Sequence, residues 1–274
     1  MRVDGKSVRR AVERLGPQAP SGIEDELAVE EPLAIRAGDS PLAVTMRTPG
    51  HDEELAAGFL FTEAVVDGPD EIEALRPCAE AEWGNVIEAV LAPAQAAAAE
   101  RARRASFLSS SCGICGKESI DSVRQRVAPL ADSLRWPEDL LLRFPDRMQG
   151  QQAAFARTGG LHAAALFDVH GHLACLREDV GRHNAVDKVI GHELLLGRLP
   201  LKGHGMLVSG RVSFEIVQKA ARAGVELLAA VSAPSSLAVD LARELGLTLV
   251  GFLRPGRLNL YAGGQRVLKA SAAR

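Results

Sequence analysis

Strand-like and helix-like patterns alternate through the last third of the 274-residue sequence, and few folds accommodate that order. Short apolar segments at Gly205–Ser209, Glu226–Ser232 and Leu247–Phe252 have the length of buried strands. The segments between them, Phe214–Ala223 and Ser235–Leu245, have helical spacing of apolar residues. Because strands that alternate with helices pair in parallel through right-handed crossovers, this region predicts a parallel α/β sheet.

Further strands are predicted upstream of that sheet. Gly159–Val169 is predicted to pair with Leu173–Leu176 through a turn at His170-Gly171. Three earlier segments also have strand patterns: Leu27–Ile35, Leu42–Thr48 and Asn85–Leu91. A helix is expected to begin at Asp52, which can cap it, because acidic residues suit the first turn of a helix and the apolar residues that follow have helical spacing.

These patterns divide the chain into four predicted segments. Residues 1–25 are polar and rich in Gly and Pro, which predicts a mobile lead-in. Residues 26–108 form an N-terminal lobe, residues 109–150 a cysteine-containing loop with the helices that follow it, and residues 151–274 an α/β core. The Ala-rich stretch 93–105 favours helix but lacks a strong apolar stripe, so it is expected to be a surface connector.

Composition excludes several classes of protein. The net charge of −3 offers no electrostatic footprint for nucleic acid. No apolar run approaches the roughly 20 residues that a membrane span needs. The Arg9-Arg10 pair lacks the apolar stretch of a secretory signal, so a cytoplasmic location is expected. In that compartment structural disulfides are not expected, and Cys78 and Cys175 are interpreted as ordinary small hydrophobic residues.

The other two cysteines form the motif Cys112-Gly113-Ile114-Cys115 in a polar run of Ser and Gly. Such a setting favours thiol chemistry, by metal binding, redox exchange or sulfur transfer, over core packing. A helical pattern over Glu118–Leu130 places the second thiol just before a helix N-terminus, whose partial positive charge favours the thiolate.

Three kinds of chemistry compete for this motif. A structural zinc site needs four ligands, and neither a second cysteine pair nor correctly spaced histidines accompany the motif, since His170 and His172 are too close in sequence. A thioredoxin-like motif belongs after the first strand of a small βαβ unit, not a hundred residues into a chain. Sulfur transfer needs one exposed thiolate on a flexible loop, which this setting provides. Zinc deaminase chemistry is not indicated, because no Glu follows His162 and no Pro precedes Cys112.

The loops after the predicted parallel strands are polar and should meet at one sheet edge, where open α/β sheets bind ligands. They contain Ser209-Gly210-Arg211, the run Ser232 to Ser236, and Arg254-Pro255-Gly256-Arg257. Arg side chains, hydroxyls and helix N-termini together predict an anion site, most simply for phosphate. The alternative is that Ser213 and Ser235 only cap helices while the arginines face water.

The densest polar run extends from Arg177 to Lys188. A helix beginning at Asn184 would place Asn184, Asp187 and Lys188 on one face. His183 could act as a general base or a ligand anchor. A solvated helix start with local ion pairs explains the same run equally well.

Several segments of the sequence, in a fixed order, together match a known pattern. They begin with Met46-Arg47-Thr48-Pro49-Gly50-His51-Asp52 with Leu55-Ala56-Ala57-Gly58-Phe59-Leu60, followed by residues 111–116 around the cysteine pair and by Thr158-Gly159-Gly160-Leu161-His162-Ala163-Ala164. They continue through residues 177–188, 209–215, 232–236 and 251–254. Through these segments the sequence resembles the FdhD family of formate dehydrogenase accessory sulfurtransferases.

The resemblance implies a cytidine deaminase-like three-layer α/β/α core with a second, smaller lobe, often in a homodimer. It implies that the protein accepts persulfide sulfur from a cysteine desulfurase and passes it to the molybdenum cofactor, bis(molybdopterin guanine dinucleotide), which formate dehydrogenase requires. Cys112 would carry the persulfide and Cys115 would assist. The guanine nucleotide end, mimicked by guanosine diphosphate, would lie at Phe252-Leu253-Arg254-Pro255-Gly256-Arg257, close to the predicted anion site; no intrinsic metal is implied.

A second hypothesis is a non-catalytic chaperone that holds the cofactor or the apo-dehydrogenase. The cysteine pair would then lock its loop by redox or zinc binding.

Overall fold

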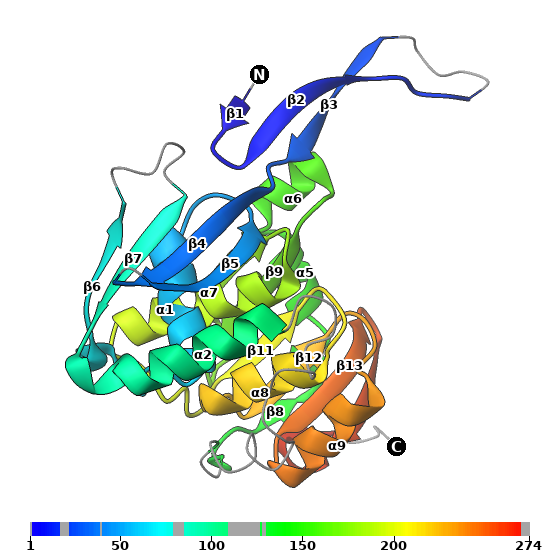
Figure 1. Ribbon diagram of the computed structural model, residues 1–274. Coiled ribbons are helices and arrows are strands. Elements are labelled where there is room, and N and C mark those ends of the chain that lie inside the picture. Colours follow the sequence, from blue (N-terminus) through cyan, green and yellow to red (C-terminus); the bar gives the residue numbers. More distant parts are fainter. Residues whose placement is uncertain are drawn as a thin grey trace, which may run out of the picture.

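The computed structural model describes residues 2–16, 22–38, 40–78, 85–108, 127 and 130–269. Within them the chain forms four sheets, and Figure 1 shows how they are arranged. The largest has the strand order β10-β9-β11-β12-β13-β14. Its strands are β9 (His162–Phe167), β10 (Leu173–Asp179), β11 (Gly205–Val208), β12 (Leu227–Ala230), β13 (Thr248–Arg254) and β14 (Arg257–Ala262).

The parallel part of this sheet is confirmed. Strands β11, β12 and β13 pair in parallel, and β9 pairs antiparallel with both β10 and β11. The connecting helices are α8 (Phe214–Arg222) and α9 (Ser236–Glu244), within two residues of their predicted bounds. The added strand β14 closes the far edge by pairing antiparallel with β13.

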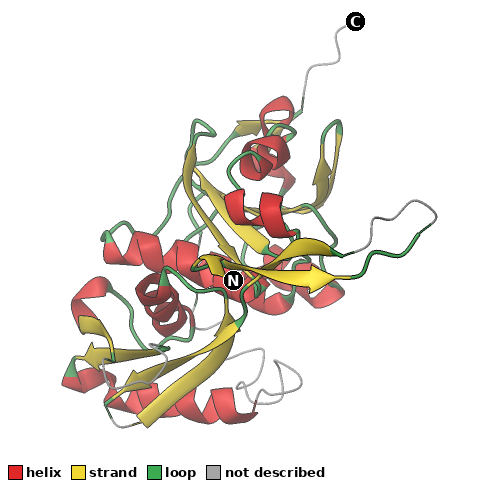
Figure 2. Ribbon diagram, turned by 90° about the horizontal axis from the view of Figure 1, so that it is seen from above, coloured by secondary structure: helices red, strands yellow, loops and turns green. Residues whose placement is uncertain are grey.

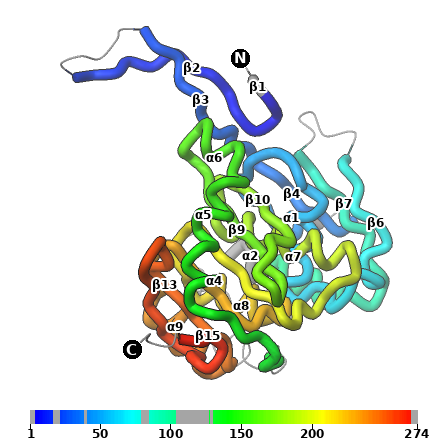
Figure 3. Tube along the Cα trace, turned by 180° about the vertical axis from the view of Figure 1, so that it is seen from behind, coloured from blue at the N-terminus to red at the C-terminus, as the bar shows by residue number. Residues whose placement is uncertain are grey.

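Both faces of the six-stranded sheet are buried, because successive strand residues point to opposite sides. On β9, Ala164 and Leu166 join one apolar core, which includes residues of α8, α9 and α7 (Arg182–Leu195). Ala163, Ala165 and Phe167 join the other core, beneath α4 (Glu138–Leu141) and α5 (Phe144–Gln149), which Figure 3 shows from behind. The core is therefore a mixed α/β structure of three layers.

Aromatic packing holds the second face. The ring of Phe144 stacks on Phe167 with centroids 3.9 Å apart, and Trp136 meets Phe144 edge-on at 4.9 Å. Trp136 lies on β8 (Trp136–Pro137), which pairs in parallel with β15 (Val267–Leu268). Offset and edge-on pairs are the favoured geometries for aromatic rings.

A smaller lobe is built on a second sheet of order β5-β4-β7-β6. Its strands are β4 (Glu31–Ala37), β5 (Ser40–Arg47), β6 (Ile72–Pro77) and β7 (Val86–Leu91), and it also contains helices α1 (Asp52–Thr62) and α2 (Ala96–Leu108) and the 3-10 turns η1 (Pro69–Glu71) and η2 (Pro93–Gln95). The sequence pattern misses β6, in which apolar and charged residues do not alternate cleanly.

Two details of this lobe differ from expectation. The N-cap of α1 is His51, at φ 59°, and Asp52 instead accepts two hydrogen bonds from the Arg47 guanidinium. The Ala-rich stretch is not a surface connector, because Ala99 and Ala102 of α2 are buried in the apolar core shared with the sheet. Small alanine side chains let this helix approach the sheet closely without the broad apolar stripe that sequence patterns detect.

The N-terminal residues also depart from the predicted lead-in. Strands β1 (Arg2–Asp4), β2 (Ser7–Val12) and β3 (Ile23–Ala28) form an antiparallel sheet that extends away from the two lobes (Figure 1) and is seen from above in Figure 2. Ser7 donates a hydrogen bond of 2.6 Å to Glu26, and Arg157 of α6 (Ala153–Thr158) pairs with both Glu26 and Asp4. These polar contacts, within the sheet and with α6, take the place of an apolar strand pattern.

The two lobes meet where α1 packs against α7. A Cβ added to Gly58 would overlap the carbonyl oxygen of Asp187, and one added to Gly191 would overlap the carbonyl oxygen of Glu54. Because neither glycine has a side chain, the two helix backbones come into direct contact. Helix α1 also contacts β6 and β7, and α7 contacts β9 and β10, so this helix pair joins the two sheets.

None of the helices in the described residues is long and apolar enough to cross a membrane.

We expect Gly58→Ala to lower the free energy of unfolding by about 1–3 kcal/mol or more, because the added methyl group forces α1 and α7 apart. Urea denaturation followed by circular dichroism measures this change. Gly68→Ala is the matched control, since an added Cβ there meets no atom within 4 Å. Equal stability of the two variants would contradict the direct helix contact.

Candidate functional site

The loops that follow β11 and β12 lie side by side at one edge of the large sheet. Val212 forms a parallel bridge with Pro234, and its amide donates to the carbonyl of Ala233 at 3.1 Å. The amide of Phe252, within β13, donates to the carbonyl of Ser232, also at 3.1 Å. The predicted convergence is confirmed for these two loops, and the second of them contacts β13.

Ser209 ties this edge to the start of β9. Its hydroxyl accepts a 2.9 Å hydrogen bond from the Ala163 amide and lies 3.4 Å from Nδ1 of His162. The next residue, Gly210, lies beneath the same ring, where an added Cβ would be 3.2 Å from Nδ1. Ser209 therefore positions His162, a residue that sequence analysis did not select as a site residue.

The surroundings of His162 favour its neutral form. Burial lowers its pKa, the Arg182 cation and the neighbouring His183 lower it further, and Asp179 only partly opposes them. A neutral imidazole at neutral pH can accept a proton or a hydrogen bond from a ligand.

Arg182 supplies an unsatisfied donor beside this histidine. Its Nε is buried and finds no hydrogen-bond partner among the described residues. Arg182 is the first residue of α7, whose N-cap, Gly181, provides no side chain to the free amides of the first turn. A buried donor on a cation next to a helix N-terminus favours an anion at this point.

The two serines that the sequence offers as helix caps, Ser213 and Ser235, make different contacts. Ser235 caps α9, because its hydroxyl accepts a 3.3 Å hydrogen bond from the Ala238 amide, so the simpler interpretation holds for this predicted site residue. Ser213 makes no capping bond to α8. Its hydroxyl lies 3.2 Å from Nε2 of His183, which in turn lies 3.0 Å from Glu215. His183 thus links the first turns of α7 and α8.

The predicted nucleotide segment forms the tip of a hairpin. Arg254 ends β13 and pairs with Arg257, which begins β14, across a turn at Pro255-Gly256. Both arginines are exposed, as is Arg211 in the β11 loop. Leu253 departs from the prediction, because its side chain is fully buried in the second apolar core and cannot contact a ligand.

The polar run after β10 is mostly structural. Lys188 is 1% exposed and forms an ion pair of 2.7 Å with Asp179, which also accepts bonds from Asn184 and from backbone amides. Asp187 pairs with Lys219 of α8 at 2.8 Å and accepts a bond from Thr62 of α1. The alternative of a solvated helix start is wrong, because these charges face α1, α8 and the sheet rather than water.

Cys112 and Cys115 lie outside the described residues, so the roles predicted for them stay predictions. Cys175 is buried on β10, and burial raises the pKa of its thiol to about 12. That thiol is not a free nucleophile at neutral pH.

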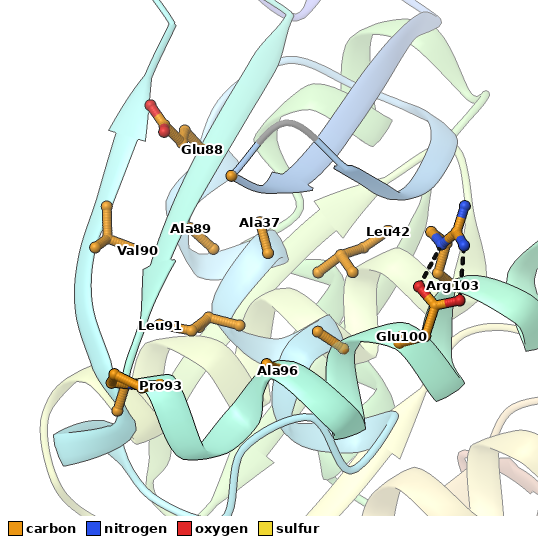
Figure 4. Close-up of a pocket in the computed structure, with 13 residues that line it drawn as sticks. Ala37, Leu42, Glu88, Ala89, Val90, Leu91, Pro93, Ala96, Glu100 and Arg103 are labelled. Atoms are coloured by element: carbon orange, nitrogen blue, oxygen red, sulfur yellow. Dashed lines mark hydrogen bonds and ion pairs between the residues drawn. The ribbon is translucent and has the colours of Figure 1, made fainter.

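A cavity of about 440 Å³ lies elsewhere, between α2 and the smaller sheet (Figure 4). Leu42, Ala96 and Leu91 line it, and an ion pair of 2.7 Å joins Glu100 to Arg103 beside it. None of the predicted site residues contributes to its lining.

The chain is similar to known proteins over most of its length. A model of the FdhD/NarQ family matches residues 28–268. The chain is 51% identical over 274 aligned residues to the sulfur carrier protein FdhD of Streptomyces avermitilis, and the alignment covers 97% of each protein. It is 48% identical over 253 residues to the protein of the same name from Mycobacterium tuberculosis, covering 89% of this chain and 92% of that protein.

A solved structure shares the fold. It is the crystal structure of a candidate formate dehydrogenase accessory protein from Desulfotalea psychrophila, with a TM-score of 0.77 and 27% identity. The superposition covers 96% of this chain and 100% of that protein.

We expect Arg182→Gln to raise the pKa of His162, because removing a nearby cation favours the protonated imidazole. Titration of the histidine resonances by NMR measures this shift, with His162→Gln to assign the signal. Arg211→Gln, in the neighbouring loop, should leave the pKa of His162 in place. An unchanged value in the Arg182 variant would show that this cation does not act on His162.

Proposed function

The chain belongs to the FdhD/NarQ family, and from this membership we propose that it carries sulfur for formate dehydrogenase. It would accept persulfide sulfur from a cysteine desulfurase and transfer it to bis(molybdopterin guanine dinucleotide), the cofactor that the dehydrogenase requires. The observation that supports this most strongly is the 51% identity, over nearly the whole chain, to a protein named as a sulfur carrier. The cysteine pair in the sequence supplies the chemistry that such a role needs.

The proposed reaction is an exchange between sulfur atoms. The Cys112 thiolate attacks the outer sulfur of the desulfurase persulfide, so that a new sulfur–sulfur bond forms, the donor bond breaks, and the donor leaves as a thiolate. In the second step Cys115 attacks the inner sulfur of the Cys112 persulfide and displaces the outer sulfur as sulfide to the acceptor. The resulting Cys112–Cys115 disulfide requires a dithiol reductant before the next cycle.

The strand-end edge is proposed to hold the cofactor as cargo. A guanine dinucleotide carries phosphates, and Arg182, the N-termini of α7 and α8, and the exposed Arg254 and Arg257 are groups that bind phosphate. Ser209 shapes the edge through its hydroxyl, which accepts a hydrogen bond from the Ala163 amide, and Ser232 does so through its backbone carbonyl, which accepts one from the Phe252 amide. The neutral His162 offers a proton acceptor beside the bound phosphates.

Three finer assignments belong to the same proposal: a cytidine deaminase-like class for the three-layer core, a homodimer in solution, and a cytoplasmic location. The core with both faces covered by helices is compatible with the first. The alternative is a chaperone that only holds the cofactor. A chaperone would also need the cationic edge but not the cysteine pair, so the two hypotheses predict different results when Cys112 is replaced.

We expect the purified protein to gain the mass of one sulfur atom when it is incubated with a cysteine desulfurase and cysteine without reductant. Intact-mass spectrometry with peptide mapping should place that sulfur on Cys112, and added thiols should remove it. Cys112→Ala should abolish the gain and lower formate dehydrogenase activity in cells to that of a strain lacking the protein. Cys78→Ala is the control and should behave as the parent.

Formate dehydrogenase that stays fully active in the Cys112→Ala strain would refute the carrier proposal and favour the holding chaperone.

We expect Arg254→Ala and Arg257→Ala each to weaken guanosine diphosphate binding by about tenfold, which corresponds to about 1.4 kcal/mol. Each variant should also depend less on salt than the parent, because one screened charge contact is gone. Calorimetric titration at two salt concentrations measures both effects. Arg101→Ala, at an exposed position of α2, is the control. Unchanged affinity in both hairpin variants would exclude the hairpin as the nucleotide site.

A further inference from the structure

A second group of chemically versatile side chains lies at the far end of α7. Cys175 of β10 and the neighbouring residues His192 and Glu193 of α7 have potential ligand atoms that all lie within 4.8 Å of one another. Helix α7 starts at Arg182 on the strand-end edge. His192 and Glu193 come ten and eleven residues later, so they lie roughly 15 Å from that edge along the helix axis. This group is therefore separate from the site proposed for the cofactor.

The buried carboxylate of Glu193 has an oxygen atom without a hydrogen-bond partner among the described residues, and this points to a ligand. Glu193 is 3% exposed, and its Oε1 is buried without a hydrogen-bond partner among the described residues. Its Oε2 lies 3.6 Å from Nη1 of Arg198, which is too long for a hydrogen bond. Buried carboxylate oxygens are normally satisfied by donors or by a cation, so this one has an open position.

The histidine is held in an orientation that suits a ligand. Nδ1 of His192 lies 3.0 Å both from Oε1 of Glu54 and from Nη2 of Arg177. In the tautomer that carries the proton on Nδ1, His192 donates a hydrogen bond to Glu54 and the lone pair of the other ring nitrogen, Nε2, is available. A carboxylate that holds one nitrogen while the other binds a metal is the usual outer arrangement of protein zinc sites. The nearby Arg177 cation is itself paired with Glu54, at 2.7 Å between Nη2 and Oε1.

We propose that Cys175, His192 and Glu193 bind one divalent transition-metal ion of the zinc type. Thiolate sulfur, imidazole nitrogen and carboxylate oxygen are the three ligand classes of zinc, and the thiolate argues against calcium or magnesium. The thiolate and the carboxylate together balance the charge of a divalent ion. As the metal–sulfur bond forms, the Cys175 thiol gives up its proton to solvent.

Binding would join the edge strand of the large sheet to the last turn of α7. The ligand atoms need to approach only to the roughly 3.5 Å separation of a tetrahedral site, which side-chain rotation can provide. A water molecule would complete the four ligands. Because the ion would bind the folded chain and not the unfolded one, it would stabilise the fold.

Cobalt binding to the full-length chain tests the proposal. The parent for this experiment is the Cys112→Ser/Cys115→Ser double variant, so that the loop thiols contribute no metal site. After treatment with a chelator, we expect one equivalent of Co²⁺ to produce the near-ultraviolet charge-transfer band of a thiolate ligand, and Zn²⁺ to displace it. Cys175→Ser should remove the band, and Glu193→Gln should weaken binding at least about tenfold. Cys78→Ser, which replaces a partly exposed cysteine, should change neither.

Absence of the band in the parent at stoichiometric Co²⁺, or an equal affinity in Glu193→Gln, would overturn the proposal. If Cys175→Ser fails to fold, Glu193→Gln still tests whether the metal ion binds at this site, because the glutamine amide keeps the shape of the glutamate side chain. A rise in melting temperature on adding Zn²⁺ to the parent, lost in Glu193→Gln, is the independent readout. Since the loop cysteines are absent throughout, failure here leaves the sulfur-carrier proposal standing.

Discussion

The backbones of α1 and α7 pack directly against one another because Gly58 and Gly191 have no side chains at the crossing. Glycine within a helix costs about 1 kcal/mol relative to alanine, so each of these residues weakens its own helix and is retained through the contact it permits. The contact brings the smaller sheet, through α1, and the large sheet, through α7, into one continuous apolar core. The position of the strand-end edge relative to the smaller lobe follows from it.

Buried polar contacts tie α7 to its neighbours. Asp187 of α7 pairs with Lys219 of α8 and accepts a hydrogen bond from Thr62 of α1, and Lys188 pairs with Asp179 at the end of β10. Removing one member of such an ion pair would leave a buried charge without a partner, which is strongly destabilising. Asp179 also accepts a hydrogen bond from the Gly181 amide. This bond positions Arg182, the first residue of α7, beside His162. The structural network and the candidate site therefore share residues.

Local patterns predicted the βαβαβ core closely, because its strands are short apolar runs and its helices have helical spacing of apolar residues between polar loops. They were less successful where packing depends on partners distant in sequence. Leu253 falls within the predicted nucleotide segment but faces the core, since a bulge between Gly251 and Arg254 changes the alternation of the strand. Ser213 looks like a cap, yet its hydroxyl faces His183, thirty residues away. The strands of residues 2–12 depend on Glu26 and Arg157, which no local window includes.

The sequence alone determined the alternation of strands and helices in the last third of the chain, the polar loops at the ends of its parallel strands, the spacing of the cysteine pair and the resemblance to a family. The tertiary structure decided which polar residues form buried structural contacts and which are available to bind a ligand. Asp187 and Lys188 look like site residues in the sequence and prove to be buried partners, whereas His162 is not selected there and lies beside Arg182 at the strand-end edge. The physical reason is that desolvation and charge pairing depend on distances in space between residues separated by tens to hundreds of positions, and sequence patterns report only neighbours along the chain.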